Sequence, residues 1–268
     1  MRILKILILT ILLFSFSPFQ AFADKSDDTL VIAFSREITN LDYHYGTKTE
    51  YLILGDMIDD SLFYVENENL TYAPSLASDF NVVDDVTLDV NLRQGVKFHD
   101  GSEMTSDDVV YTYNFIVTND KNRRHKKLAS WLKSIEKTGK YSVRFNLNSP
   151  YANLFNDLYR IKIRKNGIMG TDGNWDDNAQ ATSLNGLGPY KVISFDPGVE
   201  VVLERNESYF GGPKGNPAIK NLIIRSIPDM GTQQAELMSG GIHWMYNVKK
   251  DVGEAMAKTG KADYQIGP

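Results

Sequence analysis

One short stretch near the start of the chain constrains the fold more than any other. Residues 29–34 read TLVIAF, a nearly continuous apolar run rich in β-branched side chains. Such a run is typical of a strand that is buried on both faces. We therefore expect 29–34 to lie in the middle of a sheet. The polar segment 35–49 predicts a loop of the kind that often carries ligand contacts, and the apolar periodicity of 51–58 predicts a helix after it.

Two later stretches have an apolar residue at every second position. Residues 86–92 (VTLDVNL) and 141–147 (YSVRFNL) therefore predict antiparallel strands with one exposed face. Between them, 106–117 and 128–136 have the periodicity of helices. Together these elements predict an α+β block over 59–164.

The last part of the chain predicts further strands and a helix. The strands are expected at 199–203 and 222–227, where β-branched residues are frequent. The helix is expected at 233–238, because Gly240 and Gly241 follow it as a stop signal.

The stretch 92–115 (LRQGVKFHDGSEMTSDDVVYTYNF) raises the question of a catalytic or metal site, because His99 and Asp100 stand together in it. Asp100 and the glycine after it form a strong turn dipeptide. Thr105 and Asp108 then have the spacing of a capping box at the start of a helix. No nucleophile elbow and no second histidine at metal-ligand spacing accompany the pair. We interpret the stretch as strand, turn and helix; the alternative is a catalytic pair.

The first residues predict a secretory signal peptide over 1–23. Arg2 and Lys5 precede an apolar run that is too short to cross a bilayer comfortably, and Ala21-Phe22-Ala23 supplies a cleavage pattern. The alternative is a retained membrane anchor. The chain has no cysteine, which excludes disulfides, thiol catalysis and a lipidated cysteine. We therefore expect an exported protein of the bacterial periplasm that is not lipidated.

The net charge and the positions of the histidines argue against two further kinds of partner, nucleic acid and metal ions. The net charge is −5 and becomes more negative when a leader containing Arg2 and Lys5 is removed, which argues against a nucleic-acid partner. The four histidines, at 44, 99, 125 and 243, are scattered, and cysteine is absent. We expect no metal site and no cofactor.

Three more stretches join 92–115 in a resemblance to a known family. They are 185–192 (NGLGPYKV), 201–212 (VVLERNESYFGG) and 224–242, in which IRSIPD is followed by a helix ending MSGGI. In wording, order and spacing the four resemble the extracellular solute-binding proteins of family 5. These are the periplasmic oligopeptide, dipeptide and nickel receptors of ABC importers.

Three residues differ from the sequence motifs of the family. Leu187 stands in the threonine position of the family's GTG, and Gly241 and His243 replace the two acidic residues of GEID. These departures weaken the transfer of fine detail, not of the fold.

The resemblance implies an α/β fold of the periplasmic binding protein type II kind, in which two lobes close on a solute. It divides the chain into a first lobe made of 24–58 and 165–268, the latter running up to the hinge, and an inserted α+β domain at 59–164. Family members are about twice as long, so we expect an N-terminal half whose second lobe is missing, from a split gene, a fragment or an incomplete record. We expect this half to have little or no solute affinity alone.

The resemblance also implies candidate ligand contacts, because the loop after the first strand lines the cleft in family members. Its candidates are Asn40, Leu41, Asp42, Tyr43 and His44. Aromatic faces there could enclose an extended solute, or they could simply pack within the lobe. Arg160 falls near a carboxylate-binding position of some relatives. Trp131 is expected in the core of the inserted domain.

The implied function is solute capture for an ABC importer, with peptides as the expected solute and metal chelates or other small solutes as alternatives. The implied partners are permease subunits with their ATPase, and the receptor is expected to be a monomer. Two other classes stay open: an exported hydrolase that uses His99 and Asp100, and a sensory or chaperone-like receptor on the same fold.

Overall fold

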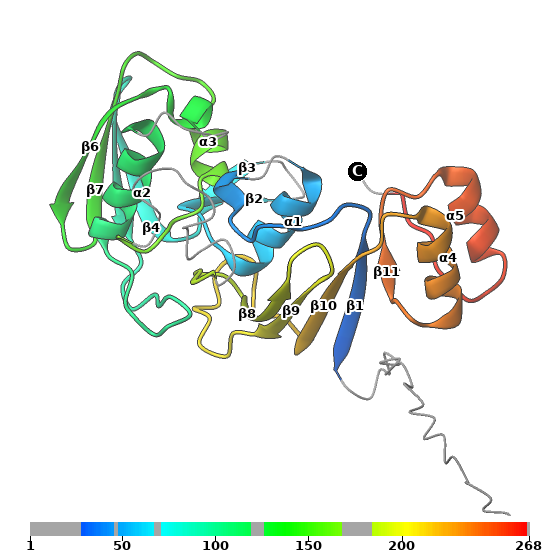
Figure 1. Ribbon diagram of the computed structural model, residues 1–268. Coiled ribbons are helices and arrows are strands. Elements are labelled where there is room, and N and C mark those ends of the chain that lie inside the picture. Colours follow the sequence, from blue (N-terminus) through cyan, green and yellow to red (C-terminus); the bar gives the residue numbers. More distant parts are fainter. Residues whose placement is uncertain (1–27, 46–47, 67–70, 119–125, 168–183, 267–268) are drawn as a thin grey trace, which may run out of the picture.

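The computed structural model describes residues 28–45, 48–66, 71–118, 126–167 and 184–266 (Figure 1). Its largest sheet has five strands in the order β11-β1-β10-β9-β8. These strands are β1 (Thr29–Phe34), β8 (Tyr190–Asp196), β9 (Glu200–Arg205), β10 (Asn221–Ser226) and β11 (Trp244–Met245). β1 is parallel to both β10 and β11, whereas β9 is antiparallel to β10 and to β8.

β1 is an interior strand that is buried on both faces, as the sequence predicts. Ile32 and Phe34 belong to an apolar cluster that includes α1 (Thr49–Ile58). Val31 and Ala33 point to the opposite face and belong to a second cluster. Side chains of α4 (Met230–Ser239) and α5 (Lys250–Ala257) pack on that second face. Because side chains alternate along a strand, an apolar run was needed to bury both faces.

A second, antiparallel sheet has four strands in the order β4-β5-β7-β6. These are β4 (Ala77–Asp84), β5 (Thr87–Leu92), β6 (Leu132–Gly139) and β7 (Ser142–Leu147). α2 (Ser106–Thr118) covers β6 and β7, and its buried Val109, Tyr113 and Ile116 face the core as predicted. Trp131 is in the same core and is 4% exposed, also as predicted.

The helix predicted at 128–136 is wrong. The chain there forms a 3-10 turn, η3 (Lys126–Ala129), and then the strand β6. A register shift between Leu132 and Ser134 inserts an extra residue into the pairing with β7, so Leu132 and Ile135 both face the core. An apolar spacing of three residues imitates a helix, and a bulge produces the same spacing in a strand.

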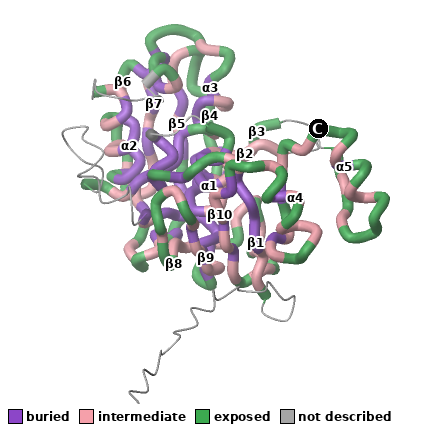
Figure 2. The backbone as a smooth tube through the Cα atoms, turned by 45° about the vertical axis from the view of Figure 1, so that its right-hand side comes forward, coloured by how far each residue is buried: buried purple, intermediate pink, exposed green. Residues whose placement is uncertain are grey.

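A small hairpin completes the fold. It consists of β2 (Phe63–Glu66) and β3 (Thr71–Pro74), which pair antiparallel, and α3 (Leu154–Arg160) packs against both. A 3-10 turn, η2 (Tyr43–Tyr45), lies in the loop after β1. Figure 2 shows buried stretches in β1, β10 and α1 and in α2, β5 and β7, and their buried side chains form two apolar clusters.

The predicted signal peptide, residues 1–23, lies outside the described residues. Among those that the structure describes, no helix combines the length and the apolar character needed to cross a membrane.

Candidate functional site

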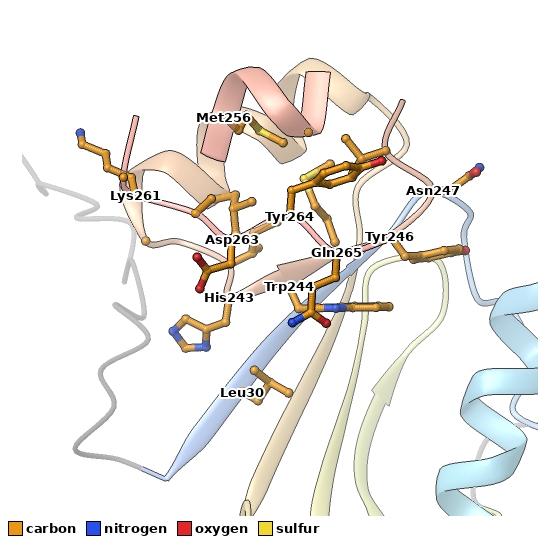
Figure 3. Close-up of a pocket in the computed structure, with 18 of the residues that line it drawn as sticks. Leu30, His243, Trp244, Tyr246, Asn247, Met256, Lys261, Asp263, Tyr264 and Gln265 are labelled. Carbon is orange, nitrogen blue, oxygen red and sulfur yellow. The ribbon is translucent and has the colours of Figure 1, made fainter. Parts of the chain in front are cut away.

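A pocket of about 1210 Å³ lies beside β11. It is lined by the start of β1, the end of α4, β11, α5 and the segment 260–266 (Figure 3). β11, which pairs with β1 in the main sheet, therefore also forms one wall of the pocket. Its lining combines aromatic rings with charged side chains, as is typical of small-molecule sites.

Two stacked aromatic rings form the apolar wall of this pocket. Trp244 is 43% exposed, and its ring lies 5.6 Å from that of Tyr246 with an angle of 13° between the planes. The Tyr246 ring makes an edge contact with Phe34. Its hydroxyl donates a hydrogen bond to the buried carboxylate of Glu50. Burial and this carboxylate raise the pKa of Tyr246. The Trp244 ring therefore lines the pocket while it stacks on Tyr246, whose position is fixed by Phe34 and Glu50.

The opposite wall comes from α5 and the segment after it. The Tyr264 ring packs on Gly253 so closely that a Cβ atom at Gly253 would lie 2.3 Å from it. Asp263 and Lys261 bring charges of both signs to the rim, where His243 also lies (Figure 3). The pocket therefore offers an aromatic surface on one side and polar groups on the other.

The five predicted contacts in the loop after β1 are buried and lie outside this pocket. Asn40 is 6% exposed, and each of Leu41, Asp42, Tyr43 and His44 is at most 2% exposed. The amide of Asp42 donates to Asn40, the amide of His44 donates to Asp42, and the His44 ring donates to the Lys162 carbonyl. These bonds hold the loop in its own shape. Direct contact of these side chains with a solute stays a prediction.

Asp42 takes part in a buried ion cluster that the sequence did not indicate. Arg164 lies between Asp42 (2.9 Å) and Asp59 (2.5 Å), and all three side chains are fully buried. Burial acts to raise the pKa of Asp42, but Arg164 and the neighbouring His44 together outweigh it and lower that pKa. Burial, together with repulsion from Asp42, raises the pKa of Asp59 to about 6 although Arg164 opposes it. The cluster ties together the loop after β1, the end of α1 and the segment after α3.

Arg160, the sixth predicted contact, is the exposed last residue of α3. Burial raises the pKa of Tyr43, and the positive charge of Arg160 opposes that rise. Arg160 thus acts electrostatically on the predicted loop while its own side chain is exposed. Its binding of a carboxylate also stays a prediction.

His99 does more than shape the predicted turn, because it joins two of the stretches that carry the resemblance. The Gly186 amide donates to its Nδ1, its Nε2 donates to the Gly188 carbonyl, and its own amide donates to the Gly186 carbonyl. Asp100 accepts hydrogen bonds from Asn185 and Lys165 across the same contact. Both ring nitrogens of His99 are thus occupied by backbone groups. Neither nitrogen can take a proton from a nucleophile, which argues against the hydrolase alternative.

Gly186 and Gly188 have no room for a side chain, because both pass close to the backbone at Ile58. A Cβ atom at Gly186 would lie 2.0 Å from the Ile58 carbonyl oxygen, and one at Gly188 would lie 2.4 Å from the Ile58 carbonyl carbon. Leu187, which differs from the family motif, is fully buried in the core cluster that also contains Val109 and Tyr113 of α2. Within the described part of the chain, no group of three or more His, Asp or Glu side chains could hold a metal ion.

Comparison with known proteins identifies relatives along most of the chain. Residues 71–268 match the family model described as bacterial extracellular solute-binding proteins, family 5 Middle. The oligopeptide-binding protein AppA of Bacillus subtilis is 32% identical over 219 residues, which are 80% of this chain and 36% of AppA. The structure of that protein in complex with a nonapeptide matches with a TM-score of 0.76 and 29% identity, over 86% of this chain and 45% of AppA.

A second similar structure is that of a protein with a bound metal chelate. NikA from Brucella suis with Fe(III)-EDTA matches with a TM-score of 0.70 and 25% identity, over 80% of this chain and 42% of NikA. The chain therefore spans less than half the length of these relatives.

Proposed function

Because this chain belongs to the bacterial extracellular solute-binding proteins of family 5, we propose that it serves in the capture of peptides for an ABC importer. The family consists of binding proteins and not of enzymes, and the mixed α/β fold is that of its solved structures. The relatives' printed names include oligopeptide binding, and this supports a peptide as the solute.

The observation that carries the proposal is the exposed Trp244 ring on its Tyr246 support, in a pocket with charges at its rim. An aromatic surface suits the apolar side chain of a peptide, and groups of both signs suit its charged ends. A metal chelate, as named for NikA, is the alternative solute. It would be held through its organic part, since the described residues offer no metal cluster.

We propose the lobe division that the resemblance implies. The segments 24–58 and 165–268 would form the first lobe, and 59–164 the inserted domain. The five-stranded sheet supports this, because it takes β1 from before the second sheet and β8 to β11 from after it. Closure of a second lobe over the solute would supply most of the affinity, because a ligand that contacts both lobes favours the closed state.

The remaining parts of the proposal concern partners and location. The receptor would deliver solute to permease subunits with their ATPase, act as a monomer, and reach the periplasm through the signal peptide without lipidation. The family's description as extracellular supports export. Among the six predicted ligand contacts, the exposed Arg160 is best placed to reach a solute carboxylate, while the buried Asn40–His44 loop would shape the lobe beneath it.

Titration of the chain with short peptides tests the proposal. We expect weak binding, on the order of 1 mM or weaker, because one lobe provides only part of the contacts. In NMR spectra the indole signal of Trp244 should shift with a peptide that carries an aromatic side chain. The Trp244→Ala variant should lose the accompanying shifts of its neighbours. Shifts elsewhere that persist in this variant, or shifts with metal chelates alone, would contradict a peptide site here.

The DNA that follows codon 268 gives an independent test. An in-frame continuation followed by permease and ATPase genes would support the transport role. A different neighbourhood would favour a sensory or chaperone-like receptor.

A further inference from the structure

His243 joins β11 to β1 through its backbone and its side chain together. Its amide donates to the Val31 carbonyl (2.8 Å), and the Val31 amide donates to its ring nitrogen Nδ1 (3.1 Å). The imidazole thus takes the place that a backbone carbonyl would occupy in an ordinary strand pair. Val31 is 4% exposed, so its amide relies on this acceptor and not on open solvent.

This pair matters because β11 is short. Beyond His243, only Trp244 and Met245 are in register with β1, opposite Ile32 and Ala33. The strand leads directly into Tyr246 and then α5, so it positions both aromatic rings of the pocket and the segment after them. Figure 3 shows the His243 and Trp244 side chains leaving the strand on different sides, with His243 toward Asp263.

An imidazole nitrogen accepts a hydrogen bond only while it carries no proton. When the ring is protonated, both nitrogens are donors, and Nδ1–H would then face the Val31 N–H. Histidine is the side chain that ordinarily changes charge between about pH 5 and 8. We propose that His243 is a proton-sensitive latch: the neutral ring holds β11 on β1, and uptake of a proton at Nδ1 loosens the strand and the pocket wall that it carries.

Charged groups surround this latch from several elements. Asp28, before β1, and Asp263, in the C-terminal segment, line the same pocket as His243 and carry negative charge. Lys261, which also lines the pocket, carries positive charge. On α4, Glu236 is paired with Arg225 of β10, so its charge is largely balanced. The pocket-lining residues of α4 and α5 are uncharged.

His243 is one of the residues at which this chain differs from the family motif. His243 stands where the resembling wording GEID has an aspartate, and a carboxylate is an acceptor that stays unprotonated down to about pH 4. A histidine at this position provides an acceptor for the Val31 amide only while Nδ1 carries no proton.

Hydrogen exchange of the Val31 and Met245 amides, measured by NMR without any solute, tests the proposal independently of the transport role. After correction for the intrinsic pH dependence of exchange, we expect both amides to exchange at least about tenfold faster at pH 5.5 than at pH 7.5. Amides of the β9–β10 pair serve as the internal control and should not change. An unchanged rate at Val31 would overturn the proposal.

Two variants separate the proton effect from the packing of the ring. In His243→Asn the amide oxygen lies near the position of Nδ1 and does not titrate, so Val31 should stay protected at both pH values. In His243→Leu the amide should exchange quickly at both. An acid-induced rise that persists in His243→Asn would contradict the latch. Nitrogen chemical shifts of the His243 ring in the unmodified chain provide a further check, since a proton on Nδ1 at pH 7.5 would also contradict it.

Discussion

At the scale of single residues, His99 and His243 each accept a hydrogen bond from a backbone amide at Nδ1, but their surroundings differ. His99 is enclosed by backbone groups of Gly186 and Gly188, and burial lowers its pKa to about 4. His243 bonds a buried amide through a ring that lies at the rim of a pocket. The sequence shows both as isolated histidines, because hydrogen-bond partners 87 and 212 residues away leave no local pattern.

Replacing His99 should change how stability depends on pH. In the unfolded chain a histidine titrates near pH 6.5, whereas folded His99 titrates near 4, so between these values the unfolded state binds more protons. The free energy of unfolding should therefore fall by about 2–3 kcal/mol as pH drops through this window. Urea unfolding at several pH values should show His99→Gln less stable than the native chain at pH 7, with a difference that shrinks towards pH 4. A constant difference would contradict this assignment, and comparison within the pair cancels the titration of Asp59.

Gly188→Ala should destabilise the protein, because its Cβ atom would meet backbone atoms of Ile58 and Asp59, at 2.4 and 2.6 Å. Backbone cannot rotate out of the way, and we expect a loss of about 2–3 kcal/mol. Gly231→Ala is the matched control, since its nearest neighbour is Asp229 Oδ1 at 3.3 Å and the residue lies in α4. There alanine should be neutral or slightly stabilising. Equal losses in thermal unfolding would show that the contact with α1 is not the cause.

At the scale of elements, hydrophobic periodicity predicted the elements with regular patterns. β1, α1, β5, α2, β7, β9, β10 and α4 agree with their predicted ranges to within a few residues. β6 was missed, because its bulge gives Leu132 and Ile135 a helical spacing. The register of β6 is set by its pairing with β7, where Phe145 and Leu147 already define the buried face.

The start of α4 provides a test of a predicted element. Asp229 accepts hydrogen bonds from the amide and hydroxyl of Thr232 (2.7 and 2.8 Å), and Gly240 ends the helix with φ of 82°. Asp229→Ala should lower the free energy of unfolding by about 1 kcal/mol. Asp251→Ala, in the first turn of α5, removes a charge in a helix whose N-cap side chain forms no bond, and should cost less than about 0.5 kcal/mol. Similar values for both variants in chemical unfolding would show that charge, and not the cap, is responsible.

At the scale of the whole molecule, the buried cluster of Arg164, Asp42 and Asp59 connects segments that are far apart in sequence. It lies where the loop after β1 and the end of α1 meet the chain that leaves α3. His99 and its glycine partners provide a second connection, from the turn after β5 to the segment before β8. The domain boundaries at 58 and 164 stay a prediction, and both connections lie close to them.

Arg164→Met should destabilise the protein strongly, by about 3–5 kcal/mol, because two fully buried carboxylates would lose their counter-charge. Arg144→Met is the control, since Arg144 pairs with Asp89 at a partly exposed site, and should cost less than about 1 kcal/mol. Adding Asp59→Asn to Arg164→Met should recover part of the loss by removing one of the two charges. If the double variant is no more stable in urea than the single one, the cluster is not held by charge balance.

The sequence by itself determined the class of this protein. Local spacing within a few residues specified the buried strand 29–34, the turn and helix after His99, and the ordered stretches that identify family 5. Only the tertiary structure decided which charged side chains are paired, that the Asn40–His44 loop faces inward, and that Trp244 and His243 lie on the wall of a pocket. Periodicity is a property of neighbours along the chain, whereas burial and charge pairing depend on contacts between distant segments that no local pattern encodes.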